Sequence, residues 1–183
     1  SCYFFMTTPS STLHTQVLVI GSGAAGQTAA LAAARNGADT LLVESAGFLG
    51  GISATLPWLG FHDRDYRLIV KGIPLEFCQR LQAMNAASAH EWDPKCASGI
   101  SIDSHWWKIL LMQLMKEAGV RLMMHTVVVD TIREGDRIAG VIVENKSGRQ
   151  RIEADVTIDC SGDGDVAARG GVKWEKGRTA DGL

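Results

Sequence analysis

The stretch from Gln16 to Glu44, QVLVIGSGAAGQTAALAAARNGADTLLVE, constrains the fold of this chain more than any other. A short apolar run, Val17–Ile20, leads into a turn rich in glycine and then into an alanine-rich segment. A second apolar run ends in a single acid, Glu44. This order is typical of a βαβ unit whose first turn has the spacing G-x-G-x-x-G, formed here by Gly21, Gly23 and Gly26.

Each glycine of the turn has a physical reason for its position. Gly21 permits a tight turn, Gly23 lets the backbone approach a pyrophosphate, and Gly26 lets the helix pack closely on the strand. The amide groups and the dipole at the start of the helix favour an anion there. Glu44 follows where a carboxylate can bind both hydroxyls of an adenosine ribose. The pattern predicts a dinucleotide site.

Composition agrees with an ordinary globular domain and argues against two classes of partner. Hydrophobic residues make up 46% of the chain and charged residues 21%, with a net charge of -2. This charge does not suggest a nucleic-acid partner. All apolar runs are far shorter than the roughly 20 residues that cross a bilayer, so we predict no membrane span. The cysteines lack C-x-x-C spacing and predict reduced thiols of a cytoplasmic protein: Cys2, Cys78, Cys96 and Cys160.

The segment after Glu44 changes from regular elements to a backbone-driven loop. Two adjacent glycines, Gly50 and Gly51, leave the backbone able to pass close to a flat or charged ligand. Helical periodicity over Asp65–Ala87, interrupted by Gly72 and Pro74, predicts two helices. Residues 88–101 are predicted to be a loop or an irregular cap.

The second half of the chain returns to regular structure. Asp103 is a good N-cap for a helix over Ser104–Ala118, which Gly119 closes. A short strand is expected at Val120–Met124. Turn signals then predict three antiparallel strands, followed by one further apolar strand: Thr126–Arg133, Arg137–Glu144, Arg149–Ala154 and Asp155–Asp159.

A second glycine-rich turn follows the last of these strands, at Ser161, Gly162 and Gly164. Because the carboxyl ends of parallel strands meet at one edge of a sheet, we expect this turn to face the same ligand as the first. The predicted fold class is α/β, a Rossmann-like βαβ parallel sheet of the FAD/NAD(P)-binding type. It carries a three-stranded antiparallel β insertion and a helical cap segment. We predict an N-terminal extension (residues 1–15), a nucleotide-binding domain (16–56 and 103–183) and a cap that begins the substrate region (57–102).

The chain resembles the FAD-dependent oxidoreductases of the glutathione-reductase-like class, distantly similar to fumarate reductase flavoproteins. The resemblance rests on motifs in a fixed order: VLVIGSGAAG with Glu44, FLGGISAT, IVKGIPLEF, EAGVRLMMHTVVVDTI, GVIVENKSGR and IDCSGDGDVAARGG. It implies FAD as cofactor and a small organic molecule as substrate. Such flavoproteins continue beyond TADGL, so we expect an N-terminal fragment, or one chain of a split protein whose second chain carries the C-terminal half.

The resemblance also implies residue roles. The first turn would hold the FAD pyrophosphate, through Gly21, Ser22, Gly23, Ala24, Ala25 and Gly26. Glu44, with Ser45 beside it, would bind the adenosine ribose. The glycine loop would follow the pyrophosphate, ribityl chain and flavin, through Gly50, Gly51, Ile52 and Ser53. The backbone of Val128 would contact the adenine edge, and the second turn would lie near the dinucleotide through Ser161, Gly162 and Asp163.

Three functional hypotheses stay open at the level of sequence. The first is a flavoenzyme acting on a small organic substrate. The second is a non-catalytic nucleotide-binding module, or a subunit that needs another chain. The third is an NAD-binding Rossmann enzyme, which Glu44 permits but which the glycine loop and the β insertion disfavour. No catalytic residue is assigned and no metal site is predicted. The polar candidates near the glycine loop or in the cap are His62, Asp63, Arg64, His90 and His105.

Overall fold

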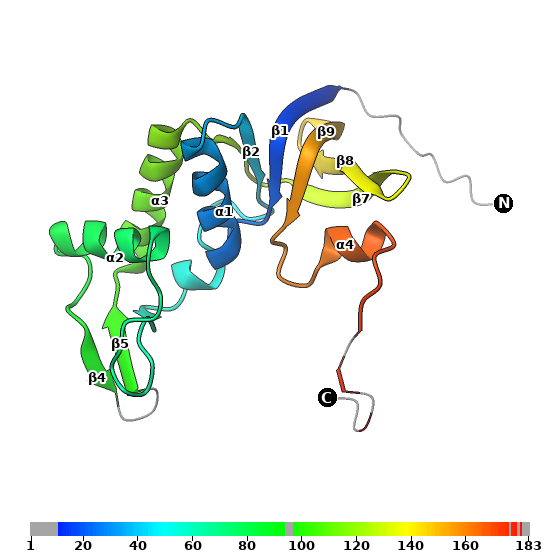
Figure 1. The fold of residues 1–183 in the computed structure, drawn as a ribbon. Coiled ribbons are helices and arrows are strands. Elements are labelled where there is room, and N and C mark those ends of the chain that lie inside the picture. The colour runs from blue at the N-terminus through cyan, green and yellow to red at the C-terminus, as the bar shows by residue number, and fades with distance from the viewer. Residues whose placement is uncertain (1–10, 94–96, 176, 179, 181–183) are drawn as a thin grey trace.

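The computed structural model describes residues 11–93, 97–175, 177–178 and 180. A six-stranded sheet runs through it in the order β6-β2-β1-β9-β8-β7, and a second, three-stranded sheet has the order β3-β5-β4 (Figure 1). The strands are β1 (Thr12–Ile20), β2 (Thr40–Val43), β3 (Trp58–Leu59), β4 (Glu91–Asp93), β5 (Ala97–Ser101), β6 (Arg121–Met123), β7 (Val127–Glu134), β8 (Arg137–Asn145) and β9 (Gly148–Asp159). The helices are α1 (Ala24–Arg35), the 3₁₀ turn η1 (Gly51–Ala54), α2 (Ile73–Ala83), α3 (Ser104–Ala118) and α4 (Asp165–Arg169).

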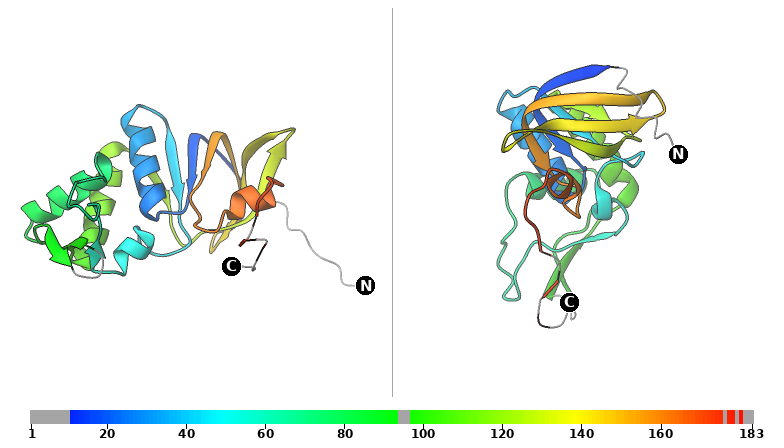
Figure 2. Two further views of the ribbon diagram at one scale, coloured as in Figure 1. Left: turned by 60° about the horizontal axis from the view of Figure 1, so that its bottom comes forward. Right: turned by 90° about the vertical axis from the view of Figure 1, so that its right-hand side faces the viewer.

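The predicted α/β class and parallel βαβ core are confirmed. β1 pairs in parallel with β2 and with β9, and β2 pairs in parallel with β6. Four strands therefore end at the same edge of the sheet. α1 lies against β1 and β2, with α3 and α2 farther out on the same side (Figure 2). The antiparallel strands β7 and β8 lie at the other end of the sheet.

Alternating side chains of β1 face two different cores. Val19 is completely buried against the helices, in a core that includes Leu31 and Trp107. Leu18 points the other way and packs with Val141 of β8. This period of two is what a strand buried on both faces requires. The β insertion thus covers the face of the parallel strands that the helices leave open.

α3 forms as its end signals predict. The Asp103 carboxylate accepts hydrogen bonds from the amides of His105 (2.8 Å) and Trp106 (3.1 Å). Gly119 adopts a left-handed conformation with φ 76° and ends the helix. These local interactions satisfy the amides that a helix start leaves unpaired.

One of the two helices predicted over 65–87 is absent. Only α2 forms, and residues 61–70 are an extended loop in which the amides of Ile69 and Val70 donate to the carbonyl of Phe61 (2.9 and 3.1 Å). The Asp63 carboxylate accepts from the amides of Asp65 and Arg67, each at 2.9 Å. Such side-chain hydrogen bonds offer the backbone an alternative to the helix, and here they replace it.

Residues 88–101 are more regular than predicted. β4 and β5 pair with each other, and β5 also pairs with β3, which lies far earlier in the chain. The indole of Trp58 in β3 lies over Gly99, where any side chain would collide with it. This packing joins two segments that are distant in sequence, so local pattern did not reveal the sheet.

Two strands predicted separately, Arg149–Ala154 and Asp155–Asp159, are one continuous strand, β9. Its first half pairs antiparallel with β8, and its residues from Arg151 to Asp159 pair in parallel with β1. Pairing with β9 also lengthens β1. The strand begins at Thr12 and not at the predicted Val17, because Thr12 pairs with Arg151. The three antiparallel strands of the insertion are confirmed, but the third is also part of the parallel sheet.

Candidate functional site

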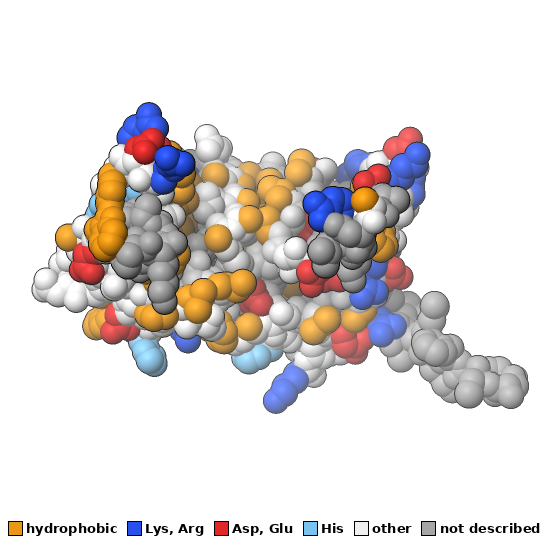
Figure 3. All heavy atoms as spheres, turned by 90° about the horizontal axis from the view of Figure 1, so that it is seen from below, with side chains coloured by type: hydrophobic (Ala, Val, Ile, Leu, Met, Phe, Trp, Pro, Cys, Tyr) orange, Lys and Arg blue, Asp and Glu red, His pale blue; other side chains and the backbone are white. Residues whose placement is uncertain are grey.

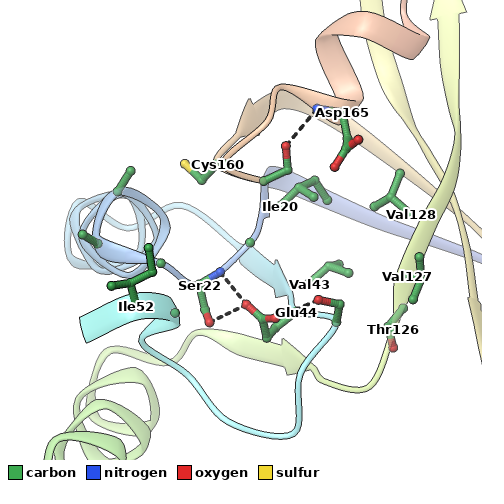
Figure 4. A pocket seen from close by; sticks show the side chains of 18 of the residues that line it. Ile20, Ser22, Val43, Glu44, Ile52, Thr126, Val127, Val128, Cys160 and Asp165 are labelled. Atoms are coloured by element: carbon green, nitrogen blue, oxygen red, sulfur yellow. Dashed lines mark hydrogen bonds between the residues drawn. The ribbon is translucent and has the colours of Figure 1, made fainter. Parts of the chain in front are cut away.

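A cavity of about 590 Å³ lies at the edge of the sheet where β1, β2 and β9 end (Figure 4). Its size is within the usual range for a small-molecule site. The lining comes from Asp165 and five segments that are separate in the sequence: 20–25, 43–45, 51–53, 126–128 and 160–162. The two glycine turns therefore face one cavity, as the sequence predicts.

The first turn is held tightly between its neighbours. The amide of Gly21 donates to the carbonyl of Val43 (2.8 Å), and the φ of Gly21 is +88°. A Cβ atom added to Gly26 would lie 1.8 Å from the carbonyl oxygen of Gly21, closer than any real contact. Glycine at position 26 therefore allows α1 to press directly against the turn, as the G-x-G-x-x-G spacing predicts.

Gly23 has the opposite surroundings. A Cβ atom built on it would meet no atom within 4 Å, and the residue lines the cavity. It also immediately precedes α1, whose first hydrogen bond within the helix is donated by Gln27 to the Gly23 carbonyl (3.0 Å). The amides before Gln27 have no partner within the helix. Open space beside unpaired amides suits a pyrophosphate.

The carboxylate of Glu44 accepts four hydrogen bonds at the cavity wall. Figure 4 shows the two from Ser22. Oε2 accepts from the Ser22 amide (2.8 Å) and the Ser22 hydroxyl (2.6 Å). Oε1 accepts from the Ala46 amide (2.7 Å) and the Ser45 hydroxyl (3.1 Å). Burial by itself raises the pKa of Glu44, but the hydrogen bonds outweigh it and hold the pKa below its ordinary value. Glu44 is therefore ionised at neutral pH.

The glycine loop passes directly over the first turn. The amide of Gly50 donates to the carbonyl of Ser22 (3.0 Å). A Cβ atom on Gly51 would lie 2.9 Å from the Cα of Gly23, and the φ of Gly51 is +53°. The close approach and the left-handed backbone both favour glycine at position 51. Ile52 follows at the cavity with 74% of its surface exposed.

The second turn is organised by Asp159, a residue that the sequence analysis did not single out. Its carboxylate accepts from the amide (3.0 Å) and hydroxyl (2.7 Å) of Ser161 and from the amide of Ala167 (2.9 Å). Burial raises the pKa of Asp159, but these hydrogen bonds lower it further than burial raises it. The Ser161 hydroxyl in turn accepts from the Asp165 amide (2.9 Å).

The third wall of the cavity is the start of β7, the edge strand of the sheet. Val128 lies there, together with Thr126 and Val127, which sequence reasoning did not select. The Thr126 amide donates to the carbonyl of Glu44 (3.0 Å) and ties this segment to β2. In the part of the chain that the structure describes, β7 is an edge strand that pairs with β8 alone, and the carbonyl of Val129 accepts from Arg169 (3.2 Å).

Most of the predicted site residues meet in this cavity, with three exceptions. Gly26 and Gly50 are buried behind the wall and shape it without lining it. Asp163 is exposed and does not line the cavity; Asp165, two residues later, does. Cys160 also lines it, and burial together with Asp159 raises the pKa of its thiol. Cys78 is likewise a free thiol, whereas Cys2 and Cys96 lie outside the described residues.

The polar candidates of the cap do not reach the cavity wall. The rings of His62 and His90 stack with their centroids 3.5 Å apart, and Asp63 pairs with Arg67 (3.0 Å). Burial and the neighbouring His90 lower the pKa of His62. Among the residues that the structure describes, no group of three or more His, Cys, Asp or Glu side chains could hold a metal ion. No helix in the described part of the chain is long and apolar enough to cross a membrane.

The model of the FAD-dependent oxidoreductase family matches residues 16–183, nearly the whole chain. The chain belongs to this family. No curated protein sequence matches it. The family resemblance seen in the sequence motifs is confirmed, and FAD is the cofactor that the family uses.

Solved flavoprotein structures share the fold at low sequence identity. A geranylgeranyl bacteriochlorophyll reductase-like protein from Thermoplasma acidophilum has a TM-score of 0.64 and 19% identity, over 88% of this chain and 43% of that one. THI4 from Thermovibrio ammonificans has a TM-score of 0.60 and 15% identity, over 87% of this chain and 64% of that one. A flavocytochrome c3 fumarate reductase has a TM-score of 0.56 and 22% identity, over 83% of this chain and 34% of that one. The chain thus spans less than two thirds of each of these structures.

The residues at the cavity fit the adenosine diphosphate half of FAD. The space beside Gly23 is free for a pyrophosphate, and the ionised Glu44 stands at the end of β2. The second turn and the start of the edge strand β7 line the same cavity. These surroundings match the chemistry that a dinucleotide requires at a parallel sheet edge.

Asp159 provides a test of how the second turn is built. In Asp159→Asn the side-chain NH₂ group must face the backbone N–H of either Ser161 or Ala167, so that one donor faces another. We therefore expect the free energy of unfolding at pH 7 to fall by about 1–3 kcal/mol. Urea unfolding of the chain measures this change. Asp163→Asn is the matched control, because Asp163 is exposed, and it should stay within about 0.5 kcal/mol of wild type.

The same variant predicts a pH dependence. The pKa of Asp159 is lower in the folded than in the unfolded chain, so its stabilisation is complete above the ordinary value of 3.8 and is lost as pH falls through the folded pKa. The stability difference between wild type and Asp159→Asn should therefore shrink on acidification. A difference that stays constant or grows below pH 4 would contradict this role.

Proposed function

We propose that this chain binds FAD through the cavity at the sheet edge and forms the adenine-binding part of a flavoprotein oxidoreductase. The observation that carries the proposal is the juxtaposition of Glu44, the open space at Gly23 and the second glycine turn around one cavity. In this assignment the first turn binds the pyrophosphate and Glu44 binds the ribose hydroxyls. The backbone of Val128, which lines the cavity on the edge strand β7, contacts the adenine.

The other predicted contacts follow from the direction of the glycine loop. Gly51, Ile52 and Ser53 line the cavity beside the first turn, so they would follow the dinucleotide from its pyrophosphate toward the flavin. The exposed side chain of Ile52 supplies an apolar contact that the chain itself leaves uncovered. Ser161 and Gly162 approach from the opposite wall. When bound, the flavin supplies the redox chemistry, and the protein provides its binding and orientation.

We propose a small organic molecule as substrate, with residues 57–102 as the beginning of its binding region. Support for this division comes from β3, β4 and β5, which make a sheet separate from the six-stranded one (Figure 2). Residues 16–56 and 103–183 form the nucleotide-binding domain in this division. We place the protein in the cytoplasm, where its two described free thiols would stay reduced.

Catalysis, in this proposal, requires polypeptide in addition to this chain. Support comes from the shares of 43%, 64% and 34% that the chain covers in three structures of the same fold. The lower face also gathers hydrophobic side chains in its middle, with charged ones toward the periphery (Figure 3). The additional polypeptide is either a continuation of the same protein or a second chain. The alternative is a nucleotide-binding module without turnover of its own.

The visible spectrum of the purified chain, together with its intact mass, tests the proposal. We expect flavin absorbance, or uptake of added FAD with a dissociation constant well below that for NAD. Protein that is folded by circular dichroism but binds neither FAD nor ADP would overturn it. Preferential binding of NAD would instead favour the NAD-dependent alternative. Turnover by the chain alone would contradict the need for additional polypeptide.

A further inference from the structure

Ser22 makes more contacts with the rest of the site than its place between two glycines requires. Its side chain is completely buried, although it lies at the wall of an open cavity. The amide and the hydroxyl both donate to Oε2 of Glu44, at 2.8 and 2.6 Å. The carbonyl and the hydroxyl both accept from the amide of Gly50, at 3.0 and 3.3 Å. One residue thus joins the first turn, the acid after β2 and the glycine loop.

We propose that the Ser22 hydroxyl is a positioning group for FAD, which fixes the Glu44 carboxylate toward the ribose and holds the Gly50–Gly51 loop over the pyrophosphate. This inference rests on the proposed FAD site and assigns to the Ser22 side chain a role that its backbone cannot fill. The general spacing G-x-G-x-x-G leaves the second position free. A hydroxyl there is therefore a feature of this chain and not a requirement of the turn.

The geometry explains why the hydroxyl affects the carboxylate specifically. A carboxylate without fixed partners can rotate about its last bond, and each fixed donor restricts that rotation. The Ser22 hydroxyl makes the shortest of the four hydrogen bonds to Glu44, and it is the one made by a fully buried side chain. Ser45 also donates a hydroxyl, but its residue is exposed and its distance is 3.1 Å. Hydrogen bonds to a charged acceptor in a shielded place are the strong ones.

The test is the affinity of Ser22→Ala for FAD and for ADP. The substitution removes only an oxygen atom from a buried position, so the backbone hydrogen bonds to Glu44 and Gly50 can persist. We expect both ligands to bind about tenfold more weakly, the size of one lost charged hydrogen bond. Ser45→Ala should weaken binding by less than this. Ser147→Ala, in the exposed turn between β8 and β9, should bind FAD as wild type does.

A pH profile separates positioning of Glu44 from a general loss of stability. The Ser22 hydrogen bonds are among the causes that lower the pKa of Glu44, so their partial loss should raise the pH at which binding falls on acidification. Glu44→Gln has no carboxylate and should lack this transition. Other titrating groups near the site are Cys160 and Asp165 in the lining and His125, whose ring packs on Gly47; all three are unchanged in every variant.

The outcomes distinguish this inference from the function on which it rests. If wild type binds neither FAD nor ADP, the proposed function fails. If wild type binds FAD and Ser22→Ala binds it equally well, with the same pH profile, the positioning role of Ser22 is wrong while the proposed function stands. Weaker binding without any displacement of the pH profile would also contradict positioning through Glu44.

Discussion

Alanine in place of Gly26 should destabilise the fold by about 3 kcal/mol, and it should abolish FAD binding with it. The added Cβ would lie 1.8 Å from the carbonyl oxygen of Gly21, which is backbone and cannot rotate away. In an ordinary helix the same substitution stabilises, because alanine is the better helix former. The close approach of α1 to the turn therefore reverses the usual sign. Chemical unfolding followed by far-UV circular dichroism measures the effect.

Gly23→Ala is the matched control for that experiment. Its new Cβ meets no atom within 4 Å and its φ of -61° is ordinary for alanine, so the free energy of unfolding should hardly change. The methyl group would project into the space that we assign to the pyrophosphate. The affinity for FAD should therefore fall by about tenfold or more. Equal stability losses in the two variants would contradict this account of the turn.

Replacing Glu44 by Gln should cost about 1–3 kcal/mol of binding free energy for adenosine-containing ligands. All four partners of the carboxylate donate to it, and an amide can accept from only one of its two ends. The NH₂ group must face either the amide of Ser22 or that of Ala46. The loss thus combines a missing charge with a donor placed against a donor. Titration of the variant with FAD and ADP measures it.

A ligand without ribose hydroxyls provides the control for Glu44→Gln. In the proposed assignment the first turn binds the pyrophosphate and Glu44 binds only the ribose hydroxyls. Inorganic pyrophosphate should therefore bind wild type and variant alike. Unchanged affinity for FAD in a folded variant would remove Glu44 from the ribose site. Equal weakening for pyrophosphate and ADP would show that the substitution disturbs the whole turn instead.

Elements whose signals are local could be predicted from the sequence. α3 is defined by Asp103 at one end and Gly119 at the other, and both act within a few residues of the helix terminus. The βαβ unit is equally local, since Gly21, Gly26 and Glu44 belong to one continuous stretch. The hairpin of β7 and β8 has its turn signal between its own strands. In each case the partner that satisfies the backbone lies nearby in the sequence.

Elements whose partners lie far away in the chain could not be predicted from the sequence. The continuity of β9 depends on β1, and the small sheet depends on the packing of Trp58 over Gly99. The missing helix before α2 shows the converse. The apolar positions suit a helix, but the backbone amides of Asp65 and Arg67 donate to the Asp63 carboxylate instead of to helix carbonyls. Hydrophobic periodicity does not register such competition.

The sequence by itself determined the dinucleotide turn, the acid that follows it and the family, because glycine spacing and an acid at a fixed distance are written in one short stretch. Only the tertiary structure decided how the site is closed. It brought Thr126, Val127 and Asp165 to the cavity and left Asp163 outside it. It also showed that Ser22 and Asp159 organise the two turns. The physical reason is that a hydrogen-bond partner is chosen by distance in space, which strand pairing sets and local sequence does not.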